Sequence, residues 1–404
     1  MKLPLYLPTM SNLPRMAALP PGPFARLAAL LGDHKPGKDP ISLSIGDPSG
    51  AVPDFVQAAL ARNAAGFGHY PSITGTPDWR QAAAEWLNRR FRLNGAIEPD
   101  KNILPLNGTR EGLFSVLFPL MPESKAGQRP IVAMPNPFYQ CYAAAALGSG
   151  AEPLYVPALK ENGFLPDFAG LASAILDRLA AVYICSPSNP EGAVADATYW
   201  QDLFQLAERH DFIVLADECY ADIWFDREPD CALPARLAQS GGFSRLLSFH
   251  SLSKRSGLPG LRSGLVAGDA GLVEKFRAFR NVAGPTMPAP IQAASAACWR
   301  DEAHVIANRT AYQDRMAAAE RILGNRMQRP KGGFFLWLEV GQGEEFALRA
   351  WREQGVRLLP GAYMGREFLG GKTQSNPGFS YVRVALVNDL STIMTALERL
   401  REIL

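Results

Sequence analysis

Short apolar runs alternate with helix-length segments through the middle of the chain. Runs rich in Val, Ile, Leu and Ala lie at 130–134, 180–185, 211–216, 245–249 and 264–268. Continuous apolar runs of this kind, separated by helical segments, are typical of a mostly parallel sheet with helices on both faces. The pattern therefore predicts an α/β fold built around a covered central sheet.

The last third of the chain follows a different pattern. An Ala-rich helical segment at 289–326 precedes the apolar stretches "GGFFLWLEV", "GVRLLPG" and "YVRVALV", and a final helix is expected from about residue 390. Near the start, "FARLAALLG" predicts a short amphipathic helix after a proline-rich lead. We expect an N-terminal arm that also joins a small domain (1–49), a large domain (50–285) and a small α+β domain (286–404).

The composition is that of an ordinary globular protein. Of 404 residues, 47% are hydrophobic and 20% are charged, and the net charge of +2 gives no reason to expect a nucleic-acid or membrane-surface partner. No apolar run reaches the roughly 18 residues of a membrane helix. The proline-broken start lacks the apolar core of a secretory signal. The five cysteines show no C-x-x-C spacing, so we expect a cytoplasmic protein without disulfides or a bound metal.

Polar residues follow several of the predicted strands directly. In open α/β sheets, ligands bind beyond the carboxyl ends of the strands. Each of these residues alone has an ordinary explanation as a turn former, an ion-pair partner or a core tyrosine. Together they predict a binding site at one edge of the sheet, formed by Asn189, Asp217, Tyr220, Ser251 and Lys254.

Two further features favour a phosphorylated ligand. Gly108 and Thr109 form a turn directly before a predicted helix, whose free N–H groups attract anions, although Thr109 also fits an ordinary helix cap. Arg262 adds a cation close to Lys254. A lysine amine beside an anion site suits a phosphorylated carbonyl compound held as a Schiff base, and pyridoxal 5′-phosphate (PLP) is such a compound. A phosphate dianion would also explain why arginine accompanies this lysine.

A carboxylate suits the ring nitrogen of PLP, because only a protonated ring is a strong electron sink. Asp217 would supply it, with an attraction of roughly 4 kcal/mol at about 4 Å and an effective dielectric constant of about 20. Asn189 and Tyr220 would hydrogen-bond the phenolate oxygen of the ring.

The motifs that contain these residues resemble those of the class I and II aminotransferases, PLP enzymes of fold type I. The similar stretches extend over nearly the whole chain and are "SIGDPSG", "HYPSITGTPDWR", "NGTREG", "NPFYQCY", "SPSNPEG", "ADECYADI", "SLSKRSGLPGLRSG" and "YVRVAL". The resemblance implies a seven-stranded, mostly parallel sheet and a homodimer with shared active sites. It also implies a ping-pong transfer of an amino group between an amino acid and a 2-oxo acid.

The resemblance assigns roles around the PLP ring. Lys254 matches the Schiff-base lysine that shuttles the proton, and Asp217 matches the partner of the ring nitrogen. Asn189 and Tyr220 match the phenolate partners, and Tyr139 matches an aromatic residue that stacks on the ring. The expected catalytic residues are Lys254, Asp217 and Tyr220.

The remaining matches concern the phosphate and the substrate. The phosphate positions are Gly108, Thr109, Arg110, Ser251, Ser253 and Arg262. Tyr70 matches a residue that reaches the phosphate of the neighbouring subunit. Gly46, Asn189 and Arg383 match substrate-binding positions, and the fork of Arg383 suits the α-carboxylate. Arg255 receives no role.

The stretches "NPFYQ" and "SKRSGLPGLRSG" most resemble the N-succinyldiaminopimelate aminotransferases, although Gly257 stands where asparagine is expected. N-succinyl-L,L-diaminopimelate with 2-oxoglutarate or glutamate is therefore the expected substrate pair. Arg255, Arg357 and Arg366 stay open as partners of a distal carboxylate.

Other functions fit the same cofactor residues. The alternatives are an aminotransferase of the aspartate, aromatic or alanine type and a PLP-dependent C–S β-lyase. An effector domain of a transcription regulator would need a DNA-binding segment, which the sequence does not suggest. A nicotinamide dehydrogenase is rejected because no G-x-G-x-x-G follows a predicted strand.

Overall fold

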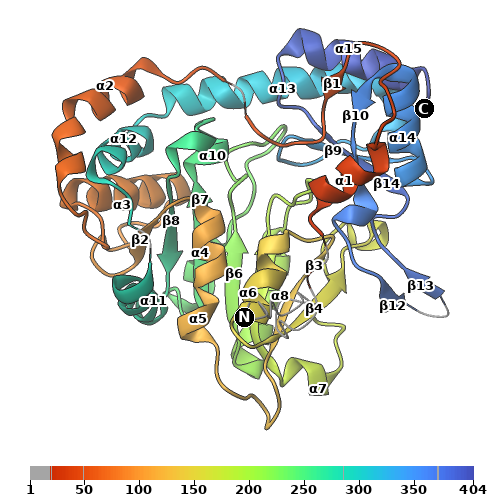
Figure 1. The fold of residues 1–404 in the computed structure, drawn as a ribbon. Coiled ribbons are helices and arrows are strands. Elements are labelled where there is room, and N and C mark those ends of the chain that lie inside the picture. Colours follow the sequence, from red (N-terminus) through yellow and green to blue (C-terminus); the bar gives the residue numbers. More distant parts are fainter. Residues whose placement is uncertain (1–18, 20, 49, 285, 371–372) are drawn as a thin grey trace, which may run out of the picture.

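The computed structural model describes residues 19, 21–48, 50–284, 286–370 and 373–404, and a seven-stranded sheet forms its centre (Figure 1). The strands follow the order β2 (Ile103–Leu106), β8 (Gly264–Gly268), β7 (Leu246–Ser251), β6 (Ile213–Asp217), β5 (Leu179–Cys185), β3 (Ile131–Asn136) and β4 (Glu152–Pro157). The strands from β7 to β4 are parallel, whereas β8 is antiparallel to both of its neighbours. The predicted α/β fold with a mostly parallel sheet is confirmed.

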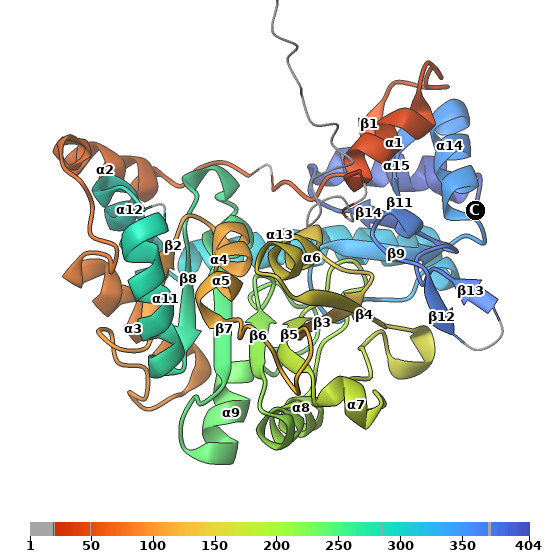
Figure 2. The same ribbon diagram turned by 60° about the horizontal axis from the view of Figure 1, so that its bottom comes forward.

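Helices cover both faces of this sheet (Figure 2). Alternate strand residues point to opposite faces, so Val182 and Ile184 pack with one group of helices while Ala181 and Tyr183 pack with the other. The first group comprises α2 (Asp54–Arg62), α3 (Pro77–Phe91), α8 (Ala197–His210), α9 (Ala232–Ser240) and α12 (Ala289–Arg300). The second comprises α4 (Thr109–Ser115), α5 (Leu117–Leu120), α6 (Gln140–Gly148) and α11 (Ala270–Ala283). Both faces are therefore buried, as continuous apolar strands require.

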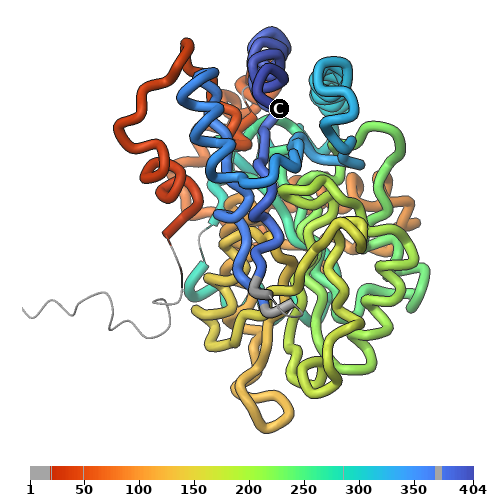
Figure 3. The backbone as a smooth tube through the Cα atoms, turned by 90° about the vertical axis from the view of Figure 1, so that its right-hand side faces the viewer, coloured from red at the N-terminus to blue at the C-terminus, as the bar shows by residue number. Residues whose placement is uncertain are grey.

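A second core lies around a smaller sheet with the order β11 (Leu359–Pro360), β14 (Tyr381–Ala385) and β9 (Phe335–Glu339). The helices around it are α1 (Pro23–Leu31), α13 (Ala303–Leu323), α14 (Gly343–Gln354) and α15 (Leu390–Arg401). The N-terminal segment joins this part, because β1 (Ile41–Ser42) pairs with β10 (Val356–Arg357) (Figure 3). The domain boundaries given above stay a prediction.

Short elements complete the fold. They are α7 (Ser173–Leu176), α10 (Leu252–Arg255), the hairpin β12 (Phe368–Gly370) with β13 (Thr373–Ser375), and the 3₁₀ turns η2 (Ala64–Gly68), η3 (Lys160–Asn162), η4 (Pro259–Leu261), η5 (Gly324–Arg326) and η6 (Gly361–Tyr363). No helix in the described part of the chain has the length and apolar character to span a bilayer.

Some details differ from the sequence expectations. The helical segment expected at 289–326 is two helices, because Asp301 has an extended backbone and its side chain accepts a hydrogen bond from the first turn of α13. β2 and β4 were not predicted, since each contains proline; β4 is an edge strand, where proline is tolerated. The proline-rich lead lies mostly in residues 1–18, outside the described residues.

Candidate active site

A cavity of about 1110 Å³ lies where β5, β6 and β7 end. Its walls also include residues from α1, from the start of α4 and from β14 of the smaller sheet. Every residue matched above to the cofactor or the substrate lines this cavity except Gly108 and Tyr70, and of the three arginines considered for a distal carboxylate only Arg366 does. The polar strand ends are thus brought together at the edge where an α/β sheet binds ligands.

Lys254 extends into the cavity from α10. Ser251 caps the N-terminus of this short helix, because its hydroxyl accepts a hydrogen bond from the backbone N–H of Ser253 at 3.1 Å. Nζ of Lys254 donates to the carbonyl of Gly46 at 2.7 Å, and burial lowers the pKa of the amine from 10.5 to about 8. The neutral form of the amine is therefore far more populated near neutral pH than that of an ordinary lysine. A desolvated amine of this kind is a competent nucleophile toward carbonyl carbon.

The approach of Gly46 to this amine depends on the absence of a side chain. A Cβ atom at Gly46 would lie 2.6 Å from the ring of Phe335. A larger residue would displace either that ring or the carbonyl that holds Lys254. The small residue at this position therefore shapes the wall beside the amine.

Asp217 is a buried carboxylate at the end of β6, with 5% exposure. It accepts hydrogen bonds from the hydroxyl of Tyr142 at 2.6 Å and from the backbone N–H of Cys219 at 3.3 Å. Burial raises its pKa, and these donors and the nearby Lys254 lower it in part. A carboxylate in this state gains a favourable partner when a cationic N–H group is placed in the cavity.

Tyr142 was missed by the sequence argument, although it lies in the quoted stretch "NPFYQCY". Its ring stacks on Tyr183 at 4.4 Å between centroids, and the hydroxyl of Tyr183 donates to the carbonyl of Leu113 at 2.6 Å. Burial raises the pKa of Tyr142, so its hydroxyl stays protonated and acts as a donor to Asp217. The sequence around Tyr142 does not indicate its hydrogen bond to Asp217, because that contact forms only when α6 packs against the sheet.

Arg383 lies in β14 and lines one wall of the cavity together with Asn189. It donates to Oδ1 of Asn189 at 2.9 Å and to the carbonyl of Ser44 at 2.8 Å, and it lies 4.3 Å from the centre of the Phe335 ring. Burial lowers its pKa to about 10, so it stays charged at pH 7. Its Nε has no hydrogen-bond partner among the described residues. The guanidinium therefore keeps capacity for an anion.

Tyr220 occupies the same wall as Arg383. Its ring packs edge-on against Phe334 and Phe335, with centroids 5.3 and 5.9 Å away. Burial raises the pKa of Tyr220, so its hydroxyl remains a donor near neutral pH. With Asn189 beside it, this wall offers polar groups to an oxygen-bearing ligand.

The opposite end of the cavity contains Arg262 and the turn before α4. Arg262 donates to the carbonyls of Pro259 at 2.8 Å and Asn107 at 3.2 Å. Gly108 has a φ of +78°, and a Cβ there would lie 2.3 Å from Nη2 of Arg262. Gly108 thus lies behind the cavity and permits the close approach of Arg262. The hydroxyl of Thr109 lies 3.0 Å from Sγ of Cys219.

Tyr139 and Arg110 also line the cavity. Nε of Arg110 hydrogen-bonds the hydroxyl of Tyr139, and the Tyr139 ring contacts Tyr142 edge-on at 5.6 Å. Tyr70 lies elsewhere, with a fully exposed side chain. Its contact with a neighbouring subunit stays a prediction.

The arrangement fits PLP on the chemistry of its groups. It combines a buried amine of lowered pKa, a buried carboxylate, an arginine held against a glycine turn, and aromatic walls. Lys254 would hold the aldehyde carbon, Asp217 the ring nitrogen, and Arg262 with Thr109 and Ser251 the phosphate. Arg383 would remain for a substrate carboxylate.

Comparisons with known proteins agree on one family. The family model "Aminotransferase class I and II" matches residues 38–397. The LL-diaminopimelate aminotransferase of Dehalococcoides mccartyi is 31% identical over 92% of this chain and 93% of its own. The 4-dedimethylamino-4-oxo-anhydrotetracycline transaminase OxyQ of Streptomyces rimosus is 33% identical over 89% of this chain and 92% of its own. A solved aminotransferase structure from Neisseria meningitidis Z2491 is 38% identical, with a TM-score of 0.91 over 98% of this chain and 100% of that chain.

Proposed function

Because the chain belongs to the class I and II aminotransferases, which are PLP-dependent transaminases, we propose that it moves the amino group of N-succinyl-L,L-diaminopimelate to 2-oxoglutarate. The observation that carries the choice of donor is an arginine in the cavity, Arg366, in addition to the one proposed for the α-carboxylate. The two relatives named above are an aminotransferase and a transaminase, which favours amino-group transfer over the C–S β-lyase alternative.

The proposed chemistry assigns one task to each residue. PLP, when bound, supplies a carbonyl carbon that exchanges amines and a ring that stabilises negative charge. Nζ of Lys254 would take the proton from Cα of the donor as a general base and then give it up as a general acid. Asp217 keeps the ring nitrogen protonated, and Arg383 orients the α-carboxylate. The same steps in reverse on 2-oxoglutarate complete a ping-pong cycle.

The three arginines considered for a distal carboxylate differ in their position relative to the cavity. Arg255 is 2% exposed and paired behind the cavity, and Arg357 lies in β10 outside the cavity wall. Arg366 lines the cavity, with its guanidinium 4.7 Å from the centre of the Phe138 ring. Arg366 is therefore the candidate.

The surroundings of Arg366 suit an anion. The fully buried side chain of Asn136 holds its backbone, accepting from its N–H and donating to its carbonyl, both at 2.9 Å. Burial lowers the pKa of Arg366, Tyr155 opposes this, and the like charge of Arg26 lowers it further. No carboxylate of the described residues is among these influences. A substrate carboxylate would compensate this charge.

L,L-diaminopimelate is the second candidate donor, because the relative from Dehalococcoides mccartyi is named for it. Its distal end carries an ammonium group beside the carboxylate. Succinylation converts that ammonium into a neutral amide and adds a further carboxylate. The charge of Arg366, which no carboxylate in the described part of the chain neutralises, favours the more anionic, succinylated donor.

The visible absorption spectrum of the PLP-loaded protein tests the donor. Addition of N-succinyl-L,L-diaminopimelate is expected to bleach the band of the bound cofactor, and 2-oxoglutarate is expected to restore it. L,L-diaminopimelate at the same concentration should bleach it more slowly. If only L,L-diaminopimelate bleaches the band, it is the donor in place of N-succinyl-L,L-diaminopimelate. If neither does, other amino acids of the aspartate, aromatic and alanine types are the donors to screen.

Arg383→Lys is expected to lower kcat/KM by roughly 10- to 100-fold for every amino donor alike. Lysine keeps the charge but cannot form the paired hydrogen bonds of a guanidinium with a carboxylate, which are worth about 1.5–3 kcal/mol. Steady-state kinetics with three donors of different side chains measure this. An effect confined to one donor contradicts an α-carboxylate role.

Arg366→Gln is expected to act selectively. We expect kcat/KM for N-succinyl-L,L-diaminopimelate to fall roughly 10-fold, the scale of one charge-assisted hydrogen bond, while alanine as donor is unaffected. Arg352→Gln, which removes an exposed arginine of α14 outside the cavity, is the matched control. Equal losses for both donors would show that Arg366 does not read the side chain.

We also propose that the enzyme is a homodimer in which Tyr70 of each subunit reaches the phosphate site of the other. The full exposure of Tyr70 and its position outside its own cavity support this arrangement. A cytoplasmic location is proposed on the composition given above.

A further inference from the structure

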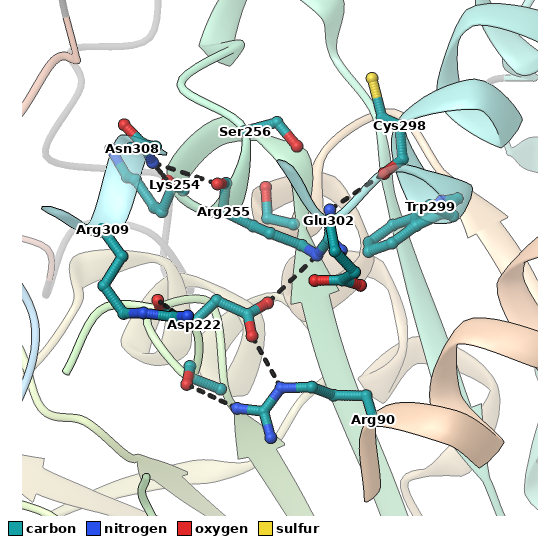
Figure 4. A network of polar contacts seen from close by, with 12 residues as sticks. Arg90, Asp222, Lys254, Arg255, Ser256, Cys298, Trp299, Glu302, Asn308 and Arg309 are labelled. Atoms are coloured by element: carbon teal, nitrogen blue, oxygen red, sulfur yellow. Dashed lines mark hydrogen bonds and ion pairs between the residues drawn. The ribbon is translucent and has the colours of Figure 1, made fainter. Parts of the chain in front are cut away.

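Arg255, the residue after Lys254, belongs to a buried polar network behind the cavity (Figure 4). Its guanidinium lies against the paired rings of Trp86 and Trp299, at 5.1 and 5.4 Å from their centres. It donates to the carbonyl of Cys298 at 3.0 Å and to Glu302 at 2.7 Å. Arg255, which received no role from the sequence, is therefore held in place by several buried contacts.

The network joins two of the segments that line the cavity. Oδ2 of Asp222 lies 3.2 Å from Nε of Arg255, and Oδ1 accepts from Nε of Arg90 at 2.8 Å. Although burial raises the pKa of Asp222, Arg90 and Arg255 lower it below the ordinary value, so this carboxylate is ionised. Asp222 follows Tyr220 in the segment after β6. The ion pair thus ties that segment to α10.

Helix α13 reaches α10 through Asn308. Its Nδ2 donates to the carbonyl of Lys254 at 3.0 Å and to the carbonyl of Arg255 at 3.1 Å (Figure 4). The last carbonyls of a helix have no partner within the helix, so an external donor fixes their direction. Nε2 of His304 also lies 2.8 Å from the hydroxyl of Ser256. The backbone of Lys254 and its neighbours is therefore held from α13.

We propose that Asn308 is a positioning residue that holds the backbone of Lys254, so that its amine is presented to the cofactor carbonyl at a fixed distance from Asp217 and Tyr220. The inference rests on the proposed role of Lys254 and not on the choice of donor. Lysine has a long, flexible side chain, so its reach is set by where its backbone is held. A displacement of about 1 Å at a reacting group can cost on the order of 100-fold in rate.

The test is the rate at which cofactor-free protein captures PLP covalently. Protein is mixed with PLP, quenched with borohydride at successive times, and the modified residue is identified and quantified by mass spectrometry. Asn308→Ala is expected to slow capture at Lys254 about 10-fold. Alanine is a strong helix former, so α13 should be retained.

Gln313→Ala is the matched control. Gln313 is also on α13, and its amide donates to the carbonyls of Trp224 at 3.2 Å and Phe225 at 3.5 Å, away from Lys254. It should capture PLP within about twofold of the wild-type rate. A loss that is equal in both variants, or wild-type capture by Asn308→Ala, would overturn the proposal.

Steady-state kinetics and melting temperatures distinguish a positioning role of Asn308 from a general effect on stability. The identity of the labelled residue tests the assignment of Lys254. Asn308→Ala should lower kcat for every donor by a similar factor with little change in KM, since substrate groups are untouched. The melting temperatures of Asn308→Ala and Gln313→Ala should be alike. If only Asn308→Ala melts at a lower temperature, and its slower capture of PLP disappears when both proteins are assayed well below their melting temperatures, Asn308 has a structural role alone. If the wild-type protein is modified at a residue other than Lys254, the proposed site itself fails.

Discussion

Lys254→Ala is expected to abolish transamination and the covalent link to PLP. The variant loses the amine that anchors the cofactor and also the group proposed to move the Cα proton. A positioned acid–base group alone contributes about 10²- to 10⁴-fold, so kcat should fall by at least that factor. Turnover with a saturating amino donor and mass spectrometry after borohydride treatment measure the two losses separately.

Lys275→Ala is the control for this experiment, because Lys275 is an exposed lysine on α11 outside the cavity. It should keep both activity and the cofactor link. In the wild-type protein, covalent capture should accelerate as the pH rises through about 8, because burial lowers the pKa of Lys254 to that value and the neutral amine is the nucleophile. Appreciable turnover by Lys254→Ala would show that Lys254 is not the catalytic lysine.

The sheet was predictable because its buried strands are continuous apolar runs. The strands β5, β6 and β7 are covered on both faces, so their composition alone marks them. β2 has only four residues, β4 is mostly only partly buried, and both contain proline, so the same argument does not find them. The break between α12 and α13 depends on the backbone at Asp301, and the Ala-rich composition on either side concealed it.

Site residues could be predicted from the sequence where they lie at the ends of parallel strands, because the order of the strands then determines their position. Asp217 and Ser251 end neighbouring parallel strands, so they must lie at one edge of the sheet. Tyr142 and Asn308 were not identified, and Arg366 could not be ranked against Arg255 and Arg357, because the position of each depends on contacts between distant segments. Arg366, for example, is held by Asn136, from β3, more than two hundred positions earlier in the chain. Hydrophobic periodicity carries no information about such a contact.

Asp217→Ala is expected to keep PLP bound to Lys254 but to lower kcat by roughly 10³-fold. The carboxylate attracts a protonated ring nitrogen by roughly 4 kcal/mol at about 4 Å and an effective dielectric constant of about 20. Each 1.36 kcal/mol corresponds to a tenfold change in rate. Borohydride labelling of Lys254 should be unchanged while single-turnover rates collapse. A variant with near-normal turnover would contradict the ring-nitrogen role.

Tyr142→Phe provides the graded comparison, because it removes only the 2.6 Å hydrogen bond to Asp217. Burial raises the pKa of Asp217 and the hydroxyl of Tyr142 lowers it, so phenylalanine should raise that pKa further. The carboxylate is then protonated at higher pH, and the acid limb of the kcat/KM profile should move to higher pH. Asp217→Ala has no such group to titrate and should lack this limb. If Tyr142→Phe and the wild type have the same pH profile, the acid limb does not report the titration of Asp217.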